Sequence, residues 1–283
     1  MDRIREAVLR ARQEGTTSPG QAQQATAQET LVPAEAKRMP TAGARVGGTS
    51  VLGPDQFQQV TCNFERFSEN RIISNEQDPV LNSYRVLRTR VLQRMEENNW
   101  KTLAIVSPGS SAGKTVTAIN LAIAIGSKED SRSTLIDLDF YRPRVTSYLG
   151  VEAAPSVLDF FEGKSELRDV TVRPNLTNTL LIGNERVSRR GAEHLTSPKA
   201  DELIRRTIND FGSRIVIFDM SPLLGCDDTI AFLPKVDCVL LVAASGESKV
   251  RDIKETRRLL SGTNIVGTVL NKAPASMTAN AYY

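Results

Sequence analysis

The sequence predicts an α/β fold, a doubly wound and mostly parallel sheet with helices on both faces. Short apolar segments recur between residues 102 and 270, and segments with helical periodicity separate several of them. Apolar strands that alternate with helices are typical of a parallel sheet that is buried on both sides. The strands are expected at 102–106, 133–136, 180–182, 214–218, 238–242 and 265–270. The helices between them are expected at 116–125, 198–211 and 250–260.

The composition fits one such domain with an appendage. The chain has 283 residues, of which 40% are hydrophobic, so it can bury a core. A net charge of +3 and 5% aromatic residues do not indicate a nucleic-acid partner. Three cysteines without C-x-x-C spacing and a single histidine argue against a zinc site and a disulfide framework. No apolar run is long enough to span a bilayer, and the charged N-terminus is unlike a signal peptide, so a cytoplasmic protein is expected.

The chain is expected to begin with a short helix over residues 1–12, which has an apolar face. This helix could dock on a partner or on a membrane surface, and it is marginal by itself. Residues 13–56 are rich in Gln, Ala, Thr, Gly and Pro, and they are expected to form a disordered arm because they bury too little apolar surface. The folded domain is expected over 57–275, and a flexible tail over 276–283.

A loop of small residues joins the first strand to its helix and reads Ser-Pro-Gly-Ser-Ser-Ala-Gly-Lys-Thr over residues 107–115. The backbone N–H groups of such a loop, at a helix N-terminus, bind phosphate oxygens. Lys114 is expected to reach the outer phosphates of a nucleotide, and the Thr115 hydroxyl is expected to hold Mg²⁺. Pro108 stands where the strict Walker A pattern has its first glycine. The residues expected to bind the nucleotide in this loop are Ser110, Ser111, Ala112, Gly113, Lys114, Thr115 and Val116.

Carboxylates follow two further strands. The second strand ends in Asp137 and Asp139, and the segment Ile-Val-Ile-Phe-Asp ends in Asp219, which is the Walker B pattern. Ligands bind to parallel sheets at the carboxyl ends of the strands. Each carboxylate alone is equally typical of a helix cap or a strand end, but together with a phosphate loop they favour a site for Mg²⁺.

Four motifs together resemble a known family: Ser-Pro-x-x-x-x-Gly-Lys-Thr, Leu-Ile-Asp-Leu-Asp-Phe-Tyr-Arg-Pro, Ile-Phe-Asp-Met-Ser-Pro and Val-Leu-Asn-Lys. Over residues 82–272 the chain resembles the bacterial cytoplasmic tyrosine kinases of capsule and exopolysaccharide export (CpsD/CapB-like, exosortase-associated type), within the MinD/ParA-like deviant P-loop ATPases. The resemblance implies a P-loop NTPase fold and transfer of the γ-phosphate of ATP to tyrosine with Mg²⁺. It also implies a homo-oligomer that works with a membrane chain-length determinant (polysaccharide co-polymerase) protein at the inner face of the plasma membrane.

The resemblance assigns chemical roles to residues of the three strand ends. Lys114, Asp137 and Asp139 are the implied catalytic residues, and the two carboxylates assist Mg²⁺ and activate the attacking hydroxyl. Thr115, Asp139 and Asp219 are the implied ligands of Mg²⁺.

Other positions are carried over in the same way. Asn271, at the end of the last expected strand, lies where relatives contact adenine. Asp228 matches a further acidic position, and Arg142 matches an arginine that either binds phosphate or is solvated. Tyr282 and Tyr283 are the implied phosphoacceptors in the tail.

The chain departs from the family pattern in two regions. Ser111 stands where the kinases usually have a glycine in the phosphate loop. The helix expected over 80–92 matches the oligomer helix of these kinases, whose pattern is Glu-x-x-Arg-x-x-Arg, but Asn82 replaces the glutamate while Arg85 and Arg88 remain. An ion pair between subunits, expected at that glutamate, would be lost or replaced.

Three functions fit these patterns. A tyrosine autokinase is favoured by the motifs, although the tail holds two tyrosines where the kinases have a cluster. A MinD/ParA-like switch ATPase that controls assembly or docking of an export complex is favoured by that sparse tail. A nucleotide-binding scaffold without catalysis is suggested by Pro108 and Ser111 in the loop.

Overall fold

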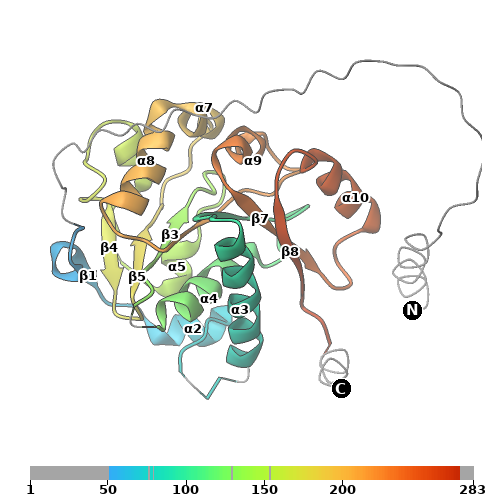
Figure 1. Ribbon diagram of the computed structural model, residues 1–283, viewed down its shortest axis with the longest axis horizontal. Helices are drawn as coiled ribbons and strands as arrows, with labels where there is room; N and C mark the ends of the chain where they lie inside the picture. The colour runs from blue at the N-terminus through green and yellow to red at the C-terminus, as the bar shows by residue number, and fades with distance from the viewer. Residues whose placement is uncertain (1–50, 76, 79, 129, 153, 275–283) are drawn as a thin grey trace, which may run out of the picture. The chain divides into compact units, whose positions relative to one another are not determined.

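The computed structural model describes residues 51–75, 77–78, 80–128, 130–152 and 154–274, and Figure 1 colours them along the chain. The helix expected over 1–12, most of the arm expected over 13–56, and the tail with Tyr282 and Tyr283 lie outside the described residues. No helix within the described ranges is long and apolar enough to cross a membrane.

Eight strands form one sheet (Figure 1). They are β1 (Gln58–Val60), β2 (Thr102–Val106), β3 (Ser133–Asp137), β4 (Thr171–Pro174), β5 (Thr179–Ile182), β6 (Ile215–Asp219), β7 (Cys238–Ala244) and β8 (Ile265–Asn271). Their order across the sheet is β1-β4-β5-β3-β6-β2-β7-β8. Neighbouring strands are parallel, except that β4 and β5 pair antiparallel. The mostly parallel doubly wound fold is therefore confirmed.

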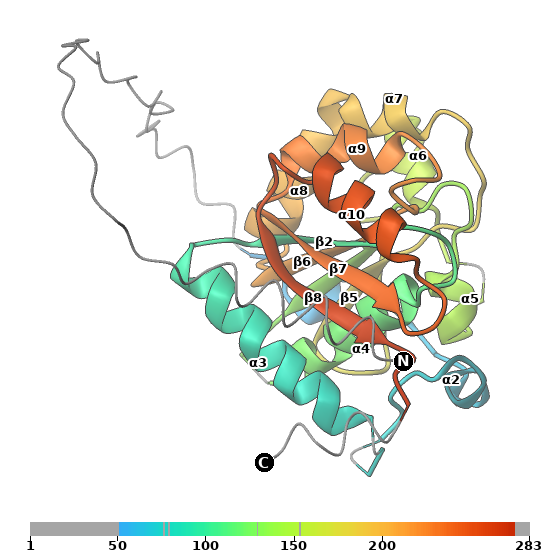
Figure 2. The ribbon, with the colours of Figure 1, turned by 90° about the vertical axis from the view of Figure 1, so that its right-hand side faces the viewer.

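Helices connect the strands and cover both faces of the sheet. The helices are α2 (Phe64–Asn70), α3 (Leu81–Glu97), α4 (Lys114–Gly126), α5 (Val145–Leu149), α6 (Val157–Phe161), α7 (Gly191–Thr196), α8 (Pro198–Asn209), α9 (Asp228–Phe232) and α10 (Val250–Leu259), with short 3-10 turns η1 (Pro54–Gln56) and η2 (Leu233–Lys235). Figure 2 shows α3 and α4 on one face, and α8, α9 and α10 on the other. The two layers follow from the alternation of side chains along each strand. In β2, Leu103 and Ile105 join the core under α4, while Ala104 and Val106 join the core on the opposite face.

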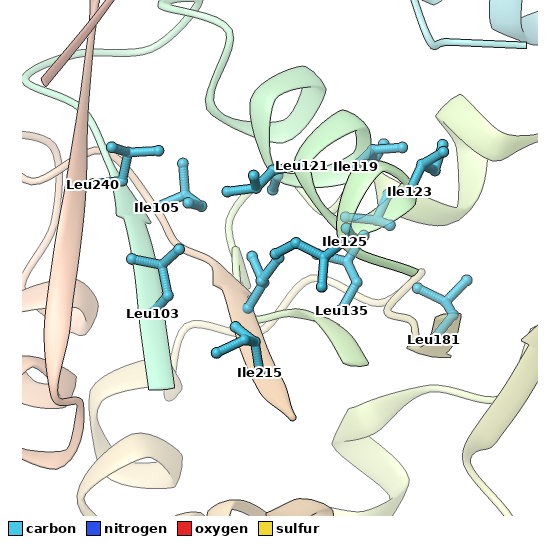
Figure 3. Packing of buried hydrophobic residues seen from close by; sticks show 14 of the residues in the cluster. Leu103, Ile105, Ile119, Leu121, Ile123, Ile125, Leu135, Leu181, Ile215 and Leu240 are labelled. Carbon is cyan, nitrogen blue, oxygen red and sulfur yellow. The ribbon is translucent and has the colours of Figure 1, made fainter. Parts of the chain in front are cut away.

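The helix after the phosphate loop is anchored over the middle of the sheet (Figure 3). Its buried Ile119, Leu121, Ile123 and Ile125 pack against apolar side chains of β2, β3, β5, β6 and β7. Because each fully buried aliphatic side chain contributes roughly 1.5 to 3 kcal/mol, a shift of α4 would be costly. The core therefore fixes the position of α4, and with it the position of the phosphate loop that precedes α4.

The segments expected to be strands are all strands, with ends that agree to within two residues. The long helices α4, α8 and α10 are confirmed as well, and the helix expected over 80–92 continues to Glu97. Two strands, β1 and β4, were not predicted, because β1 has three residues and β4 has four, including Pro174. Segments that short carry no periodicity of their own.

The packed domain begins earlier than the sequence indicates. The disordered arm was expected to extend to residue 56, but Leu52 already hydrogen-bonds within the domain. Its N–H donates to the carbonyl of Asp210 (2.8 Å), and its carbonyl accepts from the Arg132 guanidinium (2.8 Å). Backbone hydrogen bonds hold this segment in place. Its composition, which is poor in apolar side chains, does not predict these bonds.

The starts of two neighbouring strands are joined by one carboxylate. Asp237, just before β7, accepts hydrogen bonds through Oδ2 from the backbone N–H groups of Lys101 (2.8 Å) and Thr102 (2.9 Å) and from the Thr102 hydroxyl (2.7 Å). The Asp237 N–H in turn donates to that hydroxyl oxygen (2.7 Å). This network fixes the register of β2 against β7 at the edge opposite the phosphate loop.

We expect Asp237→Ala to lower the free energy of unfolding by about 1 to 3 kcal/mol, because it leaves part-buried donors of β2 without acceptors. Urea unfolding followed by circular dichroism measures this difference. The control is Asp55→Ala, which removes an almost fully exposed carboxylate whose nearest cation is 4.0 Å away. Equal stabilities of the two variants would contradict the role assigned to Asp237.

Candidate functional site

The phosphate loop lies between the end of β2 and the start of α4. Gly113 has φ +91° and Ser111 has φ +65°, so both adopt left-handed conformations. Glycine adopts this conformation freely, whereas other residues do so at a cost. Ser111, at a position where the kinases usually have a glycine, therefore adopts a conformation that glycine favours, and it carries local strain.

Two side chains at the start of α4 face the neighbouring strand end. Lys114 is buried, with 6% of its surface exposed. The Thr115 hydroxyl donates to Oδ2 of Asp219 (2.6 Å), at the end of β6. The other carboxylate oxygen of Asp219, Oδ1, is buried without a hydrogen-bond partner among the described residues. Because buried polar atoms normally have partners, this oxygen is a free ligand position.

The carboxylates of Asp137 and Asp219 lie on paired positions of adjacent strands, since the two residues are in register between β3 and β6. Asp137 is fully buried, and its Oδ2 accepts from the N–H groups of Arg144 and Val145 (3.0 Å each) at the start of α5. Its Oδ1 accepts from the N–H of Asp139 (3.1 Å). Burial and the nearby charges of Asp219 and Asp139 raise the pKa of Asp137 well above its usual range.

Asp139 faces the cavity beside the loop. Its Oδ1 accepts from the Arg142 N–H (3.0 Å) and from the Ser221 hydroxyl (2.9 Å). Ser221 was not predicted as a site residue, although it lies two residues after Asp219 in the third motif. The Arg142 contact is made by its backbone, so it gives no role to the guanidinium.

A cavity of about 1550 Å³ opens over the loop. Its lining includes Ser110, Ser111, Gly113, Lys114, Thr115, Val116, Asp139, Tyr141, Arg142, Ser221 and Asn271. Small-molecule pockets are commonly about 300 to 1000 Å³, so this one can hold a nucleotide and part of a second ligand. Ala112, also in the loop, is buried and is not part of this lining.

The residues expected to hold Mg²⁺ fit that ion in part. The described residues contain no group of three or more His, Cys, Asp and Glu side chains arranged to hold a metal. Thr115 and Asp139 nevertheless line the cavity with a hydroxyl and a carboxylate, and the buried Asp219 behind Thr115 has an oxygen without a partner among the described residues. Mg²⁺ is usually held by one or two carboxylates together with substrate phosphates and water.

Three further residues were assigned by resemblance, and within the described part of the chain none of them hydrogen-bonds to Thr115, Asp139 or Asp219. Asp228, at the start of α9, is buried against Gly191, and it is not part of the cavity lining. Asn271 lines the cavity, with its amide on the carbonyl of Ala112 (2.9 Å). Arg88 donates to the carbonyl of Ala124 (2.9 Å) at the end of α4, a contact that the sequence does not indicate.

The carboxylate cluster makes stability depend on pH. Burial and the charge of Asp139 raise the pKa of Asp219 to about 6, although Lys114 and the Thr115 hydroxyl oppose the shift. The pKa of an aspartate in an unfolded chain is about 3.9. Since the folded-state value is higher, protonated Asp219 stabilises the fold at low pH, and this contribution is lost as the pH rises through about 6.

We expect Asp219→Asn to be more stable than the wild type at pH 7.5, by about 2 to 3 kcal/mol, with an advantage that shrinks toward pH 4.5. Urea unfolding across this pH range measures the difference. The control is Asp169→Asn, which changes an exposed carboxylate. An Asp219→Asn advantage that does not change with pH would show that the buried charge of Asp219 is not its cause.

The geometry agrees with comparisons to known proteins. The chain is 27% identical over 198 residues to EpsB of Ralstonia nicotianae, which covers 69% of this chain and 26% of that protein. It is 28% identical over 200 residues to the tyrosine-protein kinase CpsD of Streptococcus pneumoniae serotype 4, which covers 69% of this chain and 85% of CpsD. The chain therefore spans about a quarter of the length of EpsB and most of CpsD.

Solved structures and the family assignment give the same result. The kinase domain of the Escherichia coli tyrosine kinase ETK superposes with a TM-score of 0.66 at 26% identity, over 72% of this chain and 80% of that domain. Residues 103–282, which contain the loop and both acidic strand ends, match the CobQ/CobB/MinD/ParA nucleotide-binding domain. The chain belongs to this family of nucleotide-binding domains.

Proposed function

We propose that this protein is an ATP-dependent protein-tyrosine kinase of the bacterial type, which transfers the γ-phosphate of ATP to tyrosine. The observation that carries the proposal is the convergence of Lys114, Thr115 and Asp139 with Asp219 at the carboxyl ends of three adjacent strands. Relatives of similar sequence are named tyrosine-protein kinases, and one of them is matched over most of its length.

In this proposal the loop and Lys114 bind the triphosphate. The N–H groups at the start of α4 and the buried ammonium group of Lys114 supply positive charge where negative charge develops during phosphoryl transfer. Thr115 and Asp219 would hold Mg²⁺, which neutralises phosphate charge when it is bound. The free Oδ1 of Asp219 is the position available for it.

We assign different roles to Asp137 and Asp139, the two aspartates of the second motif. Both oxygens of Asp137 accept backbone hydrogen bonds, so we assign it the positioning of the segment that carries Asp139. Asp139 lines the cavity, and we assign it the acceptance of the phenol proton. The Ser221 hydroxyl holds the Asp139 carboxylate in place (2.9 Å).

The proposal extends to the setting in which the kinase works. By the resemblance of its motifs, the protein would act in exopolysaccharide or capsule polymerisation and export, as a homo-oligomer. Its membrane partner would be a chain-length determinant or polysaccharide co-polymerase protein, which would hold it at the inner face of the plasma membrane. Co-purification with such a partner after membrane solubilisation would test this setting.

One alternative has an observation in its favour. The chain contains two tyrosines at its end and five in total, so acceptors are few. A switch ATPase with the same site would hydrolyse ATP and change its assembly or docking without phosphorylating itself. Release of phosphate without any phosphotyrosine would favour this alternative.

We expect the purified full chain, incubated with ATP and Mg²⁺, to gain the mass of one or more phosphoryl groups. Lys114→Ala should lower this rate by at least about 100-fold, because a charge that stabilises the transferring phosphoryl group is removed. Intact-mass spectrometry over time measures it. Lys254→Ala, which changes an exposed lysine of α10, is the control. Unchanged phosphorylation in Lys114→Ala would contradict the site.

The acceptor is tested separately. We expect the double variant Tyr282→Phe/Tyr283→Phe to bind ATP as the wild type does, and to lose most of the incorporated phosphate. Calorimetry and phosphopeptide mapping give the two measurements. Ser261→Ala, which removes an exposed hydroxyl outside the cavity lining, serves as the control. Equal labelling of the double variant and the wild type would show that the acceptor lies elsewhere.

A further inference from the structure

The carboxamide of Asn271 contacts the phosphate loop from the side of the last strand. Its Nδ2 donates to the carbonyl of Ala112 (2.9 Å), which lies 159 positions earlier in the chain. Its Oδ1 accepts from the N–H of Lys272 (2.8 Å). One donor and the acceptor are therefore both used within the protein, and this orients the amide.

The strand side of this contact is held firmly. The Asn271 carbonyl accepts from the Ser245 N–H (2.8 Å), and Asn271 pairs with Ala244 of β7. Lys272 follows with φ +57°, and its ammonium group lies 2.8 Å from both carboxylate oxygens of Glu247. The backbone that carries the Asn271 amide is therefore held in place by these contacts.

The loop side is fitted to the amide. A Cβ atom on Gly113 would lie 2.0 Å from Nδ2 of Asn271, so only glycine allows this approach. On the other side, the Gly113 carbonyl accepts from the N–H (2.9 Å) and the hydroxyl (2.8 Å) of Thr117 in α4. Gly113 is therefore held between Asn271 of β8 and the first turn of α4.

We propose that Asn271 is a positioning residue that braces the Ala112–Gly113 peptide for phosphate binding. The peptide is planar and trans, so the Ala112 carbonyl and the Gly113 N–H point in opposite directions. A donor that holds the carbonyl therefore also fixes the direction of that N–H, which points away from Asn271. This role deepens the proposed function, since it rests on phosphate binding by this loop, and it holds whatever Asn271 contacts at the base.

Inorganic tripolyphosphate with Mg²⁺ tests the brace, because it has no base. We expect Asn271→Ala and Asn271→Leu to weaken tripolyphosphate and ATP binding by the same factor, about five- to tenfold, in titration calorimetry. Asn271→Leu keeps the volume of the side chain and so excludes a simple cavity effect. Without any ligand, hydrogen exchange should become faster in peptides covering residues 109–113.

Asn264→Ala is the matched control, because Asn264 makes the same kind of bond, from its amide to the carbonyl of Asp237 (2.9 Å), at the other end of β8. It should change neither tripolyphosphate binding nor exchange in the loop. If the Asn271 variants weaken ATP alone, the residue acts on the base and the brace is wrong. If they change neither ligand, it is wrong as well. A wild type that binds tripolyphosphate but forms no phosphotyrosine would contradict the kinase and leave the brace intact.

Discussion

The adjacency of β3, β6 and β2 is the constraint on which the site depends. Parallel strands end at the same edge, so this order brings Asp137 and Asp219 to one place, with the loop that follows β2 beside them. Carboxylates buried this close repel one another, and burial alone disfavours their charge. The fold therefore concentrates negative charge where Lys114 and the Thr115 hydroxyl only partly compensate it. In the proposed function, a cation bound together with phosphate would offset this remaining negative charge.

The same constraint explains why Asp137 and Asp139 have different surroundings. Asp137 lies inside the sheet edge and is saturated by backbone N–H groups, so its carboxylate shapes the turn into α5. Asp139 stands two residues later, past the end of β3, and reaches the cavity. Two residues separate an acid held inside the sheet edge from one that, although largely buried, lines the cavity, and both depend on the position of β3 against β6.

Features that depend on local sequence pattern could be predicted from the sequence. Uniformly apolar segments located the strands, and the loop at residues 107–115 and the acids at the ends of two of them predicted the candidate site. Contacts between distant segments were not predictable in this way. The bond from Asn271 to Ala112 joins positions 159 apart, and the contact of Arg88 with the end of α4 depends on how α3 packs. Short elements such as β1 and α5 were missed because tertiary contacts, rather than periodicity, stabilise them.

The packing of α3 shows how closely the rest of the domain is tied to the loop. At one end of α4, the guanidinium of Arg88 donates to the Ala124 carbonyl (2.9 Å) and the Ser127 hydroxyl (3.2 Å), and so satisfies acceptors that a helix end leaves open. Toward the loop, the phenol of Tyr84 lies beside the side chains of Thr117 and Asn120, which oppose the rise in its pKa that burial causes. Thr117 is also the residue that holds the Gly113 carbonyl. The helix that resembles an oligomer helix therefore packs along α4, whose Thr117 holds the phosphate loop, and Arg88 is engaged within its own chain although Asn82 replaces the family's glutamate.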